Sequence, residues 1–473
     1  MSELAARRTD VDVVVVGAGI SGLVAAHGLE RHGATLEVLE ANARPGGVIG
    51  TQRRDSVLFE RGPNSTLDTT PLINELLDVL GIRAERAEAT AAAATRFIVR
   101  GGALVPLPTS PGAFLTTRAF SLGAKLRLLR EPFIAPAPAD AEESIAAFVR
   151  RRLGTEFLDY AIDPFVSGVY AGDPERISVK AAFPRLHALE QTYGGLIKGQ
   201  IKGARERRRS AETSKNAAAS FSFRDGMQTL TDALARAIPR LETGVQVRRL
   251  EHYADDGTWL VAGSRSGEPV LRRARSVLLA LPAYEAAKLV RDLAPAAARA
   301  LGAIDYAPVA SVASAYRRND VAHALAGFGF LVPKKEQRQI LGSLFSSSMF
   351  EGRAPADTVL LTTFVGGRRN PALPAKSDAE LAAIVHAELA SLVGARNEPL
   401  WTEITRWPHA IPQYDLGHLA RLDPVADAER MLRGLFFCAS YRGGVSVGDC
   451  IKSAHTMAQA VDAYLRAPSA RRS

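Results

Sequence analysis

Cysteine is scarce in this chain, whose 473 residues include only Cys438 and Cys450. A secreted domain held by disulfides is therefore not expected, and the two thiols fit a reducing compartment. The first ten residues contain no apolar segment of signal-peptide length, and no run reaches the roughly 18 apolar residues of a membrane-spanning helix. We therefore expect a cytoplasmic protein.

Clusters of catalytic and metal-ligating residues are also absent from the sequence. The nine histidines are scattered, as His27, His32, His187 and His252 illustrate, and there is no Ser-His-Asp, Cys-His or zinc-type spacing. No internal repeat and no nucleic-acid-binding motif is present. We therefore assign no catalytic acid or base and no metal ligand, and expect the histidines to be structural or superficial.

Negative charge is in deficit, because arginine gives the chain a net charge of +9 and an isoelectric point near 9.6. The hydrophobic content of 47% and the charged content of 23% are ordinary for a globular protein. The basic excess fits a general bias, an acidic substrate or anionic lipid, and nucleic acid ranks last among these partners. The length allows two or three domains.

A glycine motif near the N-terminus organises the rest of the chain. Residues 13–16 form a short apolar run typical of a buried parallel strand, and Gly17, Gly19 and Gly22 follow it directly. The first glycine permits a tight turn, the second lets the backbone approach a pyrophosphate, and the third lets a helix pack on the strand. Glu40 ends the next predicted strand, where its carboxylate can accept hydrogen bonds from ribose hydroxyls. The pattern predicts a dinucleotide site at a helix N-terminus.

A second pair of glycines indicates which dinucleotide is bound. Residues 44–47 read Arg-Pro-Gly-Gly, and residues 60–64 read Glu-Arg-Gly-Pro-Asn. The added glycines bring another stretch of bare backbone beside the cofactor, which a nicotinamide enzyme does not usually need. Here the sequence resembles the superfamily of FAD-dependent amine oxidases and phytoene desaturases, whose N-terminal fingerprint continues into such an Arg-x-Gly-Gly.

The middle of the chain has segments of different character. Residues 112–133 combine large apolar side chains with four basic ones, so they can lie in a membrane interface or cover a core or a partner. Their composition alone slightly favours a core. Residues 142–153 and 156–166 are predicted as helices, and the strongly basic residues 198–216 as a solvated helix end and loop. Strands predicted between residues 300 and 400 indicate one antiparallel sheet, a separate substrate layer.

The C-terminal region has the same order of elements as the first motif, a strand, a glycine-rich loop and a helix, and this order can again bind an anion. Residues 434–439 predict a buried strand, residues 440–444 a glycine-rich loop, and residues 445–464 a helix. The N–H groups at the start of this helix can face the pyrimidine edge of a flavin, where the reduced ring carries negative charge. Alternatively, the segment is an ordinary capped helix with Asp449 as a first-turn acid.

With residues 441–451, Tyr-Arg-Gly-Gly-Val-Ser-Val-Gly-Asp-Cys-Ile, the resemblance narrows to the oxygen-dependent protoporphyrinogen oxidase family. Residues 60–65, 327–333 and 407–414 match the same family, so the similarity spans almost the whole chain. The resemblance implies an α/β protein with a Rossmann-type FAD-binding domain built from separated segments, an α+β substrate domain and a helical, membrane-associated domain. The implied ranges are 8–90, 217–300 and 400–470 for the FAD domain, 301–399 with parts of 170–195 for the substrate domain, and 91–216 for the helical domain.

The resemblance also implies which residues contact the ligands. The FAD contacts fall on Gly17, Ala18, Gly19, Ile20, Ser21, Gly22, Glu40, Ala41, Arg44, Gly46, Gly47, Val48, Gly62, Pro63, Asn64, Ser65, Val247, Trp407, Val445, Ser446 and Val447. The substrate pocket falls on Arg96, Phe328, Gly329, Leu331, Phe364 and Asn64. Asn64 departs from the pattern, because some members carry arginine there.

Arg96 is the one side chain that we assign to a substrate propionate. A planar guanidinium can hold a carboxylate through two parallel hydrogen bonds. From the residues alone, Arg96 would equally fit an ordinary surface arginine at the end of a strand.

The chemistry implied by the resemblance is the six-electron oxidation of protoporphyrinogen IX to protoporphyrin IX in haem biosynthesis. Non-covalent FAD would take two electrons at a time, and oxygen would reoxidise it with release of hydrogen peroxide. The resemblance favours the membrane-interface interpretation of residues 112–133, on the inner face of the cell membrane. A homodimer and a hand-over of the product to ferrochelatase are further partner hypotheses.

Three alternatives stay open. A coproporphyrinogen III oxidase of the same fold would act on a substrate with four propionates instead of two. A flavin amine oxidase or carotenoid desaturase is the second, although an amine oxidase needs an aromatic cage that Tyr441 and Arg442 do not obviously supply. A flavin-binding module without catalytic activity is the third, and it would turn over no porphyrinogen.

Overall fold

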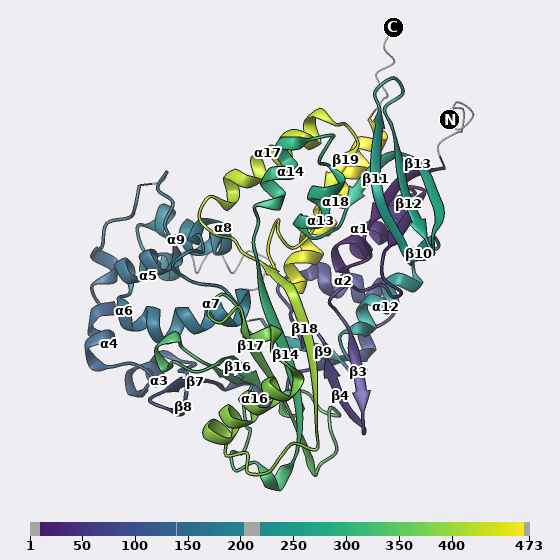
Figure 1. The fold of residues 1–473 in the computed structure, drawn as a ribbon. Helices are drawn as coiled ribbons and strands as arrows, with labels where there is room; N and C mark the ends of the chain where they lie inside the picture. The colour runs from purple at the N-terminus through teal and green to yellow at the C-terminus, as the bar shows by residue number, and fades with distance from the viewer. Residues whose placement is uncertain (1–9, 139, 203–217, 468–473) are drawn as a thin grey trace.

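The computed structural model describes residues 10–138, 140–202 and 218–467 as a mixed α/β fold with two large sheets (Figure 1). In Figure 1 the first sheet lies at the upper right, the second lies below it, and short helices gather at the left. The α/β class is therefore as predicted. Most of the basic segment 198–216 falls outside the described residues, so the predicted loop there stays a prediction.

The first sheet joins strands from three distant parts of the sequence. Its strand order is β10-β2-β1-β13-β12-β11, with β19 also paired to β13. The bounds are β1 Val11–Val16, β2 Leu36–Glu40, β10 Leu241–Thr243, β11 Val245–Tyr253, β12 Thr258–Arg265, β13 Glu268–Leu279 and β19 Leu435–Phe437. Both neighbours of β1 and both neighbours of β2 are parallel, as is the pairing of β13 with β19, whereas β11, β12 and β13 form an antiparallel meander.

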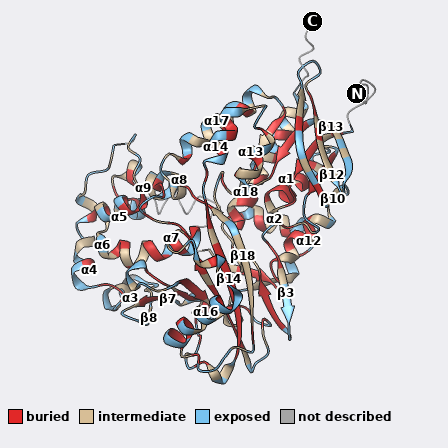
Figure 2. Ribbon diagram, in the orientation of Figure 1, coloured by how far each residue is buried: buried red, intermediate tan, exposed pale blue. Residues whose placement is uncertain are grey.

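Helices cover both faces of this sheet because its central strands are apolar on both sides. In β1, Val13 and Val15 pack into one core and Val14 and Val16 into the other. The first core is closed by α1 (Ile20–Arg31), α2 (Pro71–Val79), α12 (Gln228–Arg236) and α18 (Val447–Arg466), and the second by α13 (Ala283–Leu289), α14 (Pro295–Gly302) and α17 (His418–Met431). Figure 2 shows these buried strands between partly exposed helices.

The second sheet has the order β18-β14-β17-β16-β15-β7-β8. Its bounds are β7 Arg96–Arg100, β8 Ala103–Pro106, β14 Tyr306–Arg317, β15 Gly329–Leu331, β16 Ile340–Leu344, β17 Thr358–Gly366 and β18 Trp401–Pro412. The predicted antiparallel sheet is confirmed except between β15 and β7, which run parallel. The expected range 301–399 is too narrow for this sheet, because β7 and β8 come from before it and β18 from after it.

One face of the second sheet is covered by α16 (Asp378–Val393), which packs Leu381, Val385 and Leu389 against it. Part of the other face is covered by a hairpin of β3 (Thr51–Arg54) and β4 (Val57–Glu60), because Val57 and Phe59 join the same apolar cluster as Trp401. A third, small sheet pairs β9 (Ser220–Phe223) with β5 (Thr66–Leu67) and β6 (Arg86–Glu88).

Short helices fill the region between β8 and β9. Their bounds are α3 Pro111–Thr116, α4 Leu122–Leu128, α5 Ile145–Arg152, α6 Thr155–Phe157, α7 Asp163–Tyr170, α8 Val179–Ala182, α9 Pro184–Tyr193 and α10 Leu196–Lys202. The predicted end of a helix at Val166 is wrong. A π-helical segment, Leu158–Ile162, leads into α7, and the helix continues to Tyr170, where Ala171 takes a left-handed conformation with φ 48°.

Residues 112–133 divide between core and surface. Ala119, Phe120 and Ala124 are buried in the core of the helical region. Five large apolar side chains point to solvent instead, and we call them the α4 patch: Leu115, Leu122, Leu126, Leu129 and Phe133, the last being 87% exposed. No helix among the described residues is both long and apolar enough to cross a bilayer. Composition favoured a buried segment, and this prediction is correct for Ala119, Phe120 and Ala124 but not for the α4 patch.

A buried ionic cluster anchors the segment that follows α4. Arg152, at the end of α5, is 0% exposed and binds Glu131 at 3.2 Å and also Glu190 of α9. Glu131 also accepts hydrogen bonds from the N–H groups of Leu196 and Ile197 at 2.7 and 3.0 Å, so it caps α10. Charges this deep are tolerated only when paired and fully hydrogen-bonded.

Arg152→Ala should therefore destabilise the protein by about 3–5 kcal/mol, since it leaves the buried Glu131 without its cation and leaves Glu190 paired with Arg151 alone. Arg150→Ala, two residues away on α5, is the matched control, because Arg150 pairs with Glu175 in solvent and should matter by less than about 1 kcal/mol. Urea unfolding of both variants measures the difference. A free energy of unfolding that is lowered equally in the two would contradict this account.

Candidate active site

The glycine motif forms the turn between β1 and α1 at the carboxyl end of the first sheet. Gly17 has φ 100°, and a Cβ on it would lie 2.6 Å from the carbonyl oxygen of Ala280. A Cβ on Gly22 would overlap the carbonyl oxygen of Gly17, so Gly22 lets α1 lie against the turn. A Cβ on Gly19 would meet nothing within 4 Å. The open space beside Gly19 is therefore where a pyrophosphate can approach the backbone.

No side chain of the described residues caps the start of α1. Gly19 occupies the N-cap position without a capping side chain, and the first turn contains no acidic residue. The predicted contacts Ile20 and Ser21 lie in this turn, whose partial positive charge favours phosphate. The local structure fits the predicted dinucleotide.

Glu40 ends β2 beside this turn and is only 5% exposed. One carboxylate oxygen accepts the Ala18 N–H at 2.7 Å, and the other accepts the N–H and the side-chain amide of Asn42 at 2.8 and 2.6 Å. Since a carboxylate has about four lone-pair sites, Glu40 can still accept a ribose hydroxyl. It also fixes the glycine turn directly, a role that the sequence pattern did not reveal. Ala41 follows it at the surface.

The second glycine pair lies against the first motif. The Gly46 N–H donates to the carbonyl of Ala18 at 2.7 Å, and Gly46 and Gly47 have φ 103° and 59°. Arg44 donates to the carbonyls of Ile49 and Gly47 at 2.7 and 3.1 Å. Its guanidinium thus holds its own loop, which leaves Gly47 and the neighbouring Val48 exposed.

The segment containing Gly62, Pro63, Asn64 and Ser65 links this loop to the second sheet. A Cβ on Gly62 would overlap the carbonyl oxygen of Val48, so only glycine permits the approach. On the other side, the indole N–H of Trp407 in β18 donates to the carbonyl of Arg61 at 2.9 Å. The predicted FAD contacts in residues 44–48 and 62–65 and at Trp407 are therefore neighbours.

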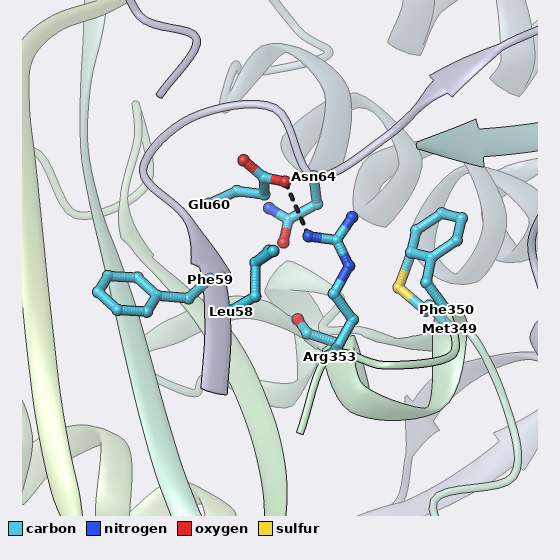
Figure 3. Close-up of a pocket in the computed structure, with 8 residues that line it drawn as sticks. Leu58, Phe59, Glu60, Asn64, Met349, Phe350 and Arg353 are labelled. Atoms are coloured by element: carbon cyan, nitrogen blue, oxygen red, sulfur yellow. Dashed lines mark hydrogen bonds and ion pairs between the residues drawn. The ribbon is translucent and has the colours of Figure 1, made fainter. Parts of the chain in front are cut away.

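A buried ion pair supports the same segment. Glu60 and Arg353 are both fully buried and lie 3.0 Å apart (Figure 3). Glu60 also accepts the Met227 N–H at 2.9 Å and the Thr51 hydroxyl at 2.6 Å. Burial raises the pKa of Glu60, and Arg353 opposes that rise. Figure 3 shows Asn64 beside this pair, where both line a cavity of ≈ 10 Å³, room for about one water molecule.

At the C-terminal end of the site, Ser446 caps α18. Its hydroxyl accepts the Asp449 N–H at 3.2 Å and donates to the Asp449 carboxylate at 2.6 Å. The helix is therefore capped and carries Asp449 in its first turn, which agrees both with a flavin-facing helix start and with an ordinary capped helix. A Cβ on Gly448 would lie 3.3 Å from Thr69, so α18 begins close to the end of the 62–65 segment. Val445 and Ser446 are half-buried there.

Val247 is the predicted contact farthest from these loops in the sequence. It lies on β11 at an irregularity in its pairing with β12, and it is half-buried against the second core of the first sheet. The preceding loop is near Glu40, because the Gly244 N–H donates to the carbonyl of Asn42 at 3.0 Å.

Four of the predicted substrate residues share one face of the second sheet: Arg96, Gly329, Leu331 and Phe364. Arg96 pairs with Gly329 across β7 and β15, while Leu331, Gly342 and Phe364 align across β15, β16 and β17. Since alternate residues of a strand point to the same face, Arg96, Leu331 and Phe364 are on the side away from α16. Trp407 is on this side too. Phe364 and Thr405 both pair with Ser311 of β14, and Trp407 lies two residues after Thr405 on β18.

Arg96 lies over Phe328, with its guanidinium carbon 5.2 Å from the ring centroid. The Arg96 side chain is exposed to solvent, and the described residues offer its guanidinium neither a hydrogen-bond acceptor nor a carboxylate. Partial desolvation of the guanidinium lowers its pKa. Phe328 and Phe364 are half-buried. An unpaired cation at the end of an apolar face suits an anionic group on an apolar ligand.

The C-terminal aromatic residue does not form a cage. Tyr441 is fully buried, and Arg442 binds Glu429 at 2.7 Å. Cys438 and Cys450 are free thiols and are buried.

Two residues near the site were not predicted from the sequence. Arg353 lies in a segment without a motif, and Tyr414 lies in a segment that matches the family but had no assigned role.

Comparisons with known proteins agree with this geometry. A model of the family described as flavin containing amine oxidoreductase matches residues 20–462. A mitochondrial protoporphyrinogen oxidase of Nicotiana tabacum is 35% identical over 486 residues, covering 97% of this chain and 96% of that protein. A coproporphyrinogen III oxidase of Bacillus subtilis is 28% identical, covering 93% and 95%. A crystal structure from Exiguobacterium, provisionally assigned as a protoporphyrinogen oxidase, has a TM-score of 0.79 at 25% identity and covers 97% and 100%.

Gly19→Ala should fold like the wild type but bind the dinucleotide at least about tenfold more weakly. Gly19 has φ −70°, which alanine adopts freely, and its new methyl group would occupy the space left for the phosphates. Gly22→Ala is the comparison, because its methyl group would displace the Gly17 carbonyl and cost about 1–3 kcal/mol of stability. Thermal unfolding and the flavin absorbance of purified protein distinguish the two effects. Full flavin content in Gly19→Ala would refute the assignment.

Proposed function

This chain belongs to the family of flavin-containing amine oxidoreductases, and we propose that its reaction is the six-electron oxidation of protoporphyrinogen IX to protoporphyrin IX. The proposal includes non-covalent FAD, oxygen as the electron acceptor and hydrogen peroxide as the second product. When bound, FAD would supply the redox chemistry by accepting two electrons in each of three rounds. The residues of the chain bind and orient the substrate.

The residues of the first sheet fit FAD in particular. Two glycine loops, at Gly17–Gly22 and Gly46–Gly47, lie against each other and leave bare backbone open, while Glu40 lies beside them. A third element, the capped start of α18, brings further N–H groups to the end of the site. Both cysteines are buried, which supports non-covalent binding.

Arg96 is the observation that carries the substrate assignment. It is a cation without a described partner, and it lies at one end of a sheet face that also carries Leu331 and Phe364. A porphyrinogen combines an apolar macrocycle with propionates, so it matches both features. Among the residues assigned to the pocket, only Arg96 is charged, so none supplies a general acid or base, and the proton steps are left to tautomerisation of the substrate.

The alternative substrate is coproporphyrinogen III, which has four propionates instead of two. The relative from Bacillus subtilis bears this name. One arginine and an apolar face favour the dicarboxylic substrate, because burying two further carboxylates without partners would be unfavourable. A flavin amine oxidase is less compatible with the fully buried Tyr441.

Arg96→Ala should lower kcat/KM for protoporphyrinogen by roughly 10- to 100-fold, at about 1.4 kcal/mol per decade, without changing the FAD content. Arg96→Lys should restore only part of the loss, because lysine keeps the charge but not the planar fork. Arg317→Ala, an exposed arginine at the end of β14, is the control and should behave as wild type. Steady-state kinetics give the result, and an unchanged kcat/KM in Arg96→Ala would remove Arg96 from the site.

We further propose that the protein binds membranes peripherally through the α4 patch. Figure 1 places α4 at the outer edge of the helical region. Lys125 donates to the carbonyls of Leu115 and Thr117, and Arg127 donates to the carbonyl of Arg151. These two side chains therefore stabilise the local backbone. Arg118 and Arg130 are exposed and remain available for anionic lipid, at about 1 kcal/mol each.

Flotation with anionic liposomes should recover the wild type at low salt, and 0.5 M salt should weaken binding only partly, because apolar burial adds to the charge attraction. Leu126→Ser/Phe133→Ser should reduce the floating fraction several-fold. Met431→Ser, which changes an exposed apolar side chain on α17, should have no effect. Absence of the wild type from the lipid fraction at low salt would contradict membrane binding and would favour a protein interface at the α4 patch.

A further inference from the structure

Tyr414 holds the loop between β19 and α18, and we propose that it is a positioning residue for the flavin site. The inference rests on the proposed function, because the loop matters for catalysis only where α18 begins beside bound FAD. Tyr414 follows β18 by two residues and is 3% exposed. It is not one of the positions assigned to either ligand.

The hydroxyl of Tyr414 bridges the two ends of residues 440–444, which we call the flavin loop. It donates to the carbonyl of Ser440 at 2.7 Å and accepts the Gly444 N–H at 2.9 Å. Burial raises the pKa of Tyr414 well above its usual value, so the hydroxyl keeps the proton that it donates. Both hydrogen bonds are therefore present across the working pH range.

The flavin loop needs such a support because its backbone is unusual. Gly443 and Gly444 have φ 92° and 121°, conformations that only glycine adopts readily. Glycines lose the most conformational freedom on folding, so a loop containing two of them is held by its hydrogen bonds more than by its own preferences. The loop leads directly to Ser446, the N-cap of α18.

His418 contributes a second contact from the same connecting segment. Its ring stacks on Tyr414 with centroids 4.1 Å apart and planes at 12°, and its Nε2 lies 2.9 Å from the carbonyl oxygen of Tyr441. Since a carbonyl can only accept, Nε2 carries the proton and donates. Burial lowers the pKa of His418, so the ring stays neutral. The pair therefore fixes the flavin loop at Ser440, Tyr441 and Gly444.

The backbone around Tyr414 joins the loop to the rest of the site. The Ser178 N–H at the start of α8 donates to the carbonyl of Tyr414 at 2.8 Å, and the Gln413 N–H donates to that of Asp305 at 2.8 Å. β18 carries Trp407 on the substrate face, so Tyr414 connects the substrate sheet, the helical region and the flavin loop. We infer that its hydroxyl sets the position of the loop relative to the substrate face.

Tyr414→Phe keeps the ring and its stacking and removes only the hydroxyl. The holoprotein is diluted, and the fluorescence of released FAD gives the dissociation constant. We expect this constant to rise by about tenfold, the flavin absorbance spectrum to shift, and KM for protoporphyrinogen to stay within about twofold of wild type. A purely structural tyrosine would lower thermal stability without moving the flavin spectrum.

Tyr316→Phe is a matched control, because Tyr316 lies on the α16 side of the second sheet, away from the substrate face. Tyr316 is also fully buried, its hydroxyl lies 3.1 Å from Nδ1 of His386, and the two rings stack at 6.0 Å. This variant should retain FAD like the wild type.

An unchanged FAD dissociation constant in Tyr414→Phe, or an equal rise in Tyr316→Phe, overturns the role of Tyr414. A wild-type protein that binds no FAD overturns the proposed function and this inference with it. The two failures are therefore distinguished by the wild-type measurement alone.

Discussion

The parallel pairing of β1 with β13, and of β13 with β19, is the constraint on which the site depends. The three strands come from the start, the middle and the end of the chain, and their carboxyl ends meet at one edge of the first sheet. The glycine turn leaves β1 at this edge, Ala280 packs against it after β13, and the flavin loop follows β19. Ligands of open α/β sheets bind at such an edge.

The second sheet is held against this edge by a small number of polar contacts between segments far apart in the sequence. Trp407 donates to the carbonyl of Arg61, and Arg353 pairs with Glu60 in the interior. Both contacts end on the segment that precedes Asn64. These two contacts help to fix the distance between the cofactor loops and the substrate face, because hydrogen bonds have narrow geometric tolerance and a buried ion pair is costly to break.

Local patterns predicted much of the first sheet and its glycine turn, because the spacing of Gly17, Gly19 and Gly22 has a direct steric cause. The resemblance assigned Arg96 and Phe364 to one pocket, and the strand register places both on one face of the second sheet. Nothing local could predict that Glu60 pairs with Arg353, since 293 positions separate them. The range 91–216 implied for the helical domain includes β7, although β7 pairs with β15 of the second sheet. The side chain of Arg44 donates hydrogen bonds to carbonyls of its own loop, which the Arg-x-Gly-Gly pattern does not reveal.

The central claim is that this chain oxidises a porphyrinogen with a flavin held between the two glycine loops. The most direct measurement follows porphyrin fluorescence in air with the purified flavoprotein, using protoporphyrinogen IX and coproporphyrinogen III in parallel. We predict oxygen-dependent formation of protoporphyrin at a rate above that of coproporphyrin, with about three molecules of hydrogen peroxide for each porphyrin, because six electrons leave in pairs. Porphyrin formation no faster than autoxidation with both substrates would contradict the account.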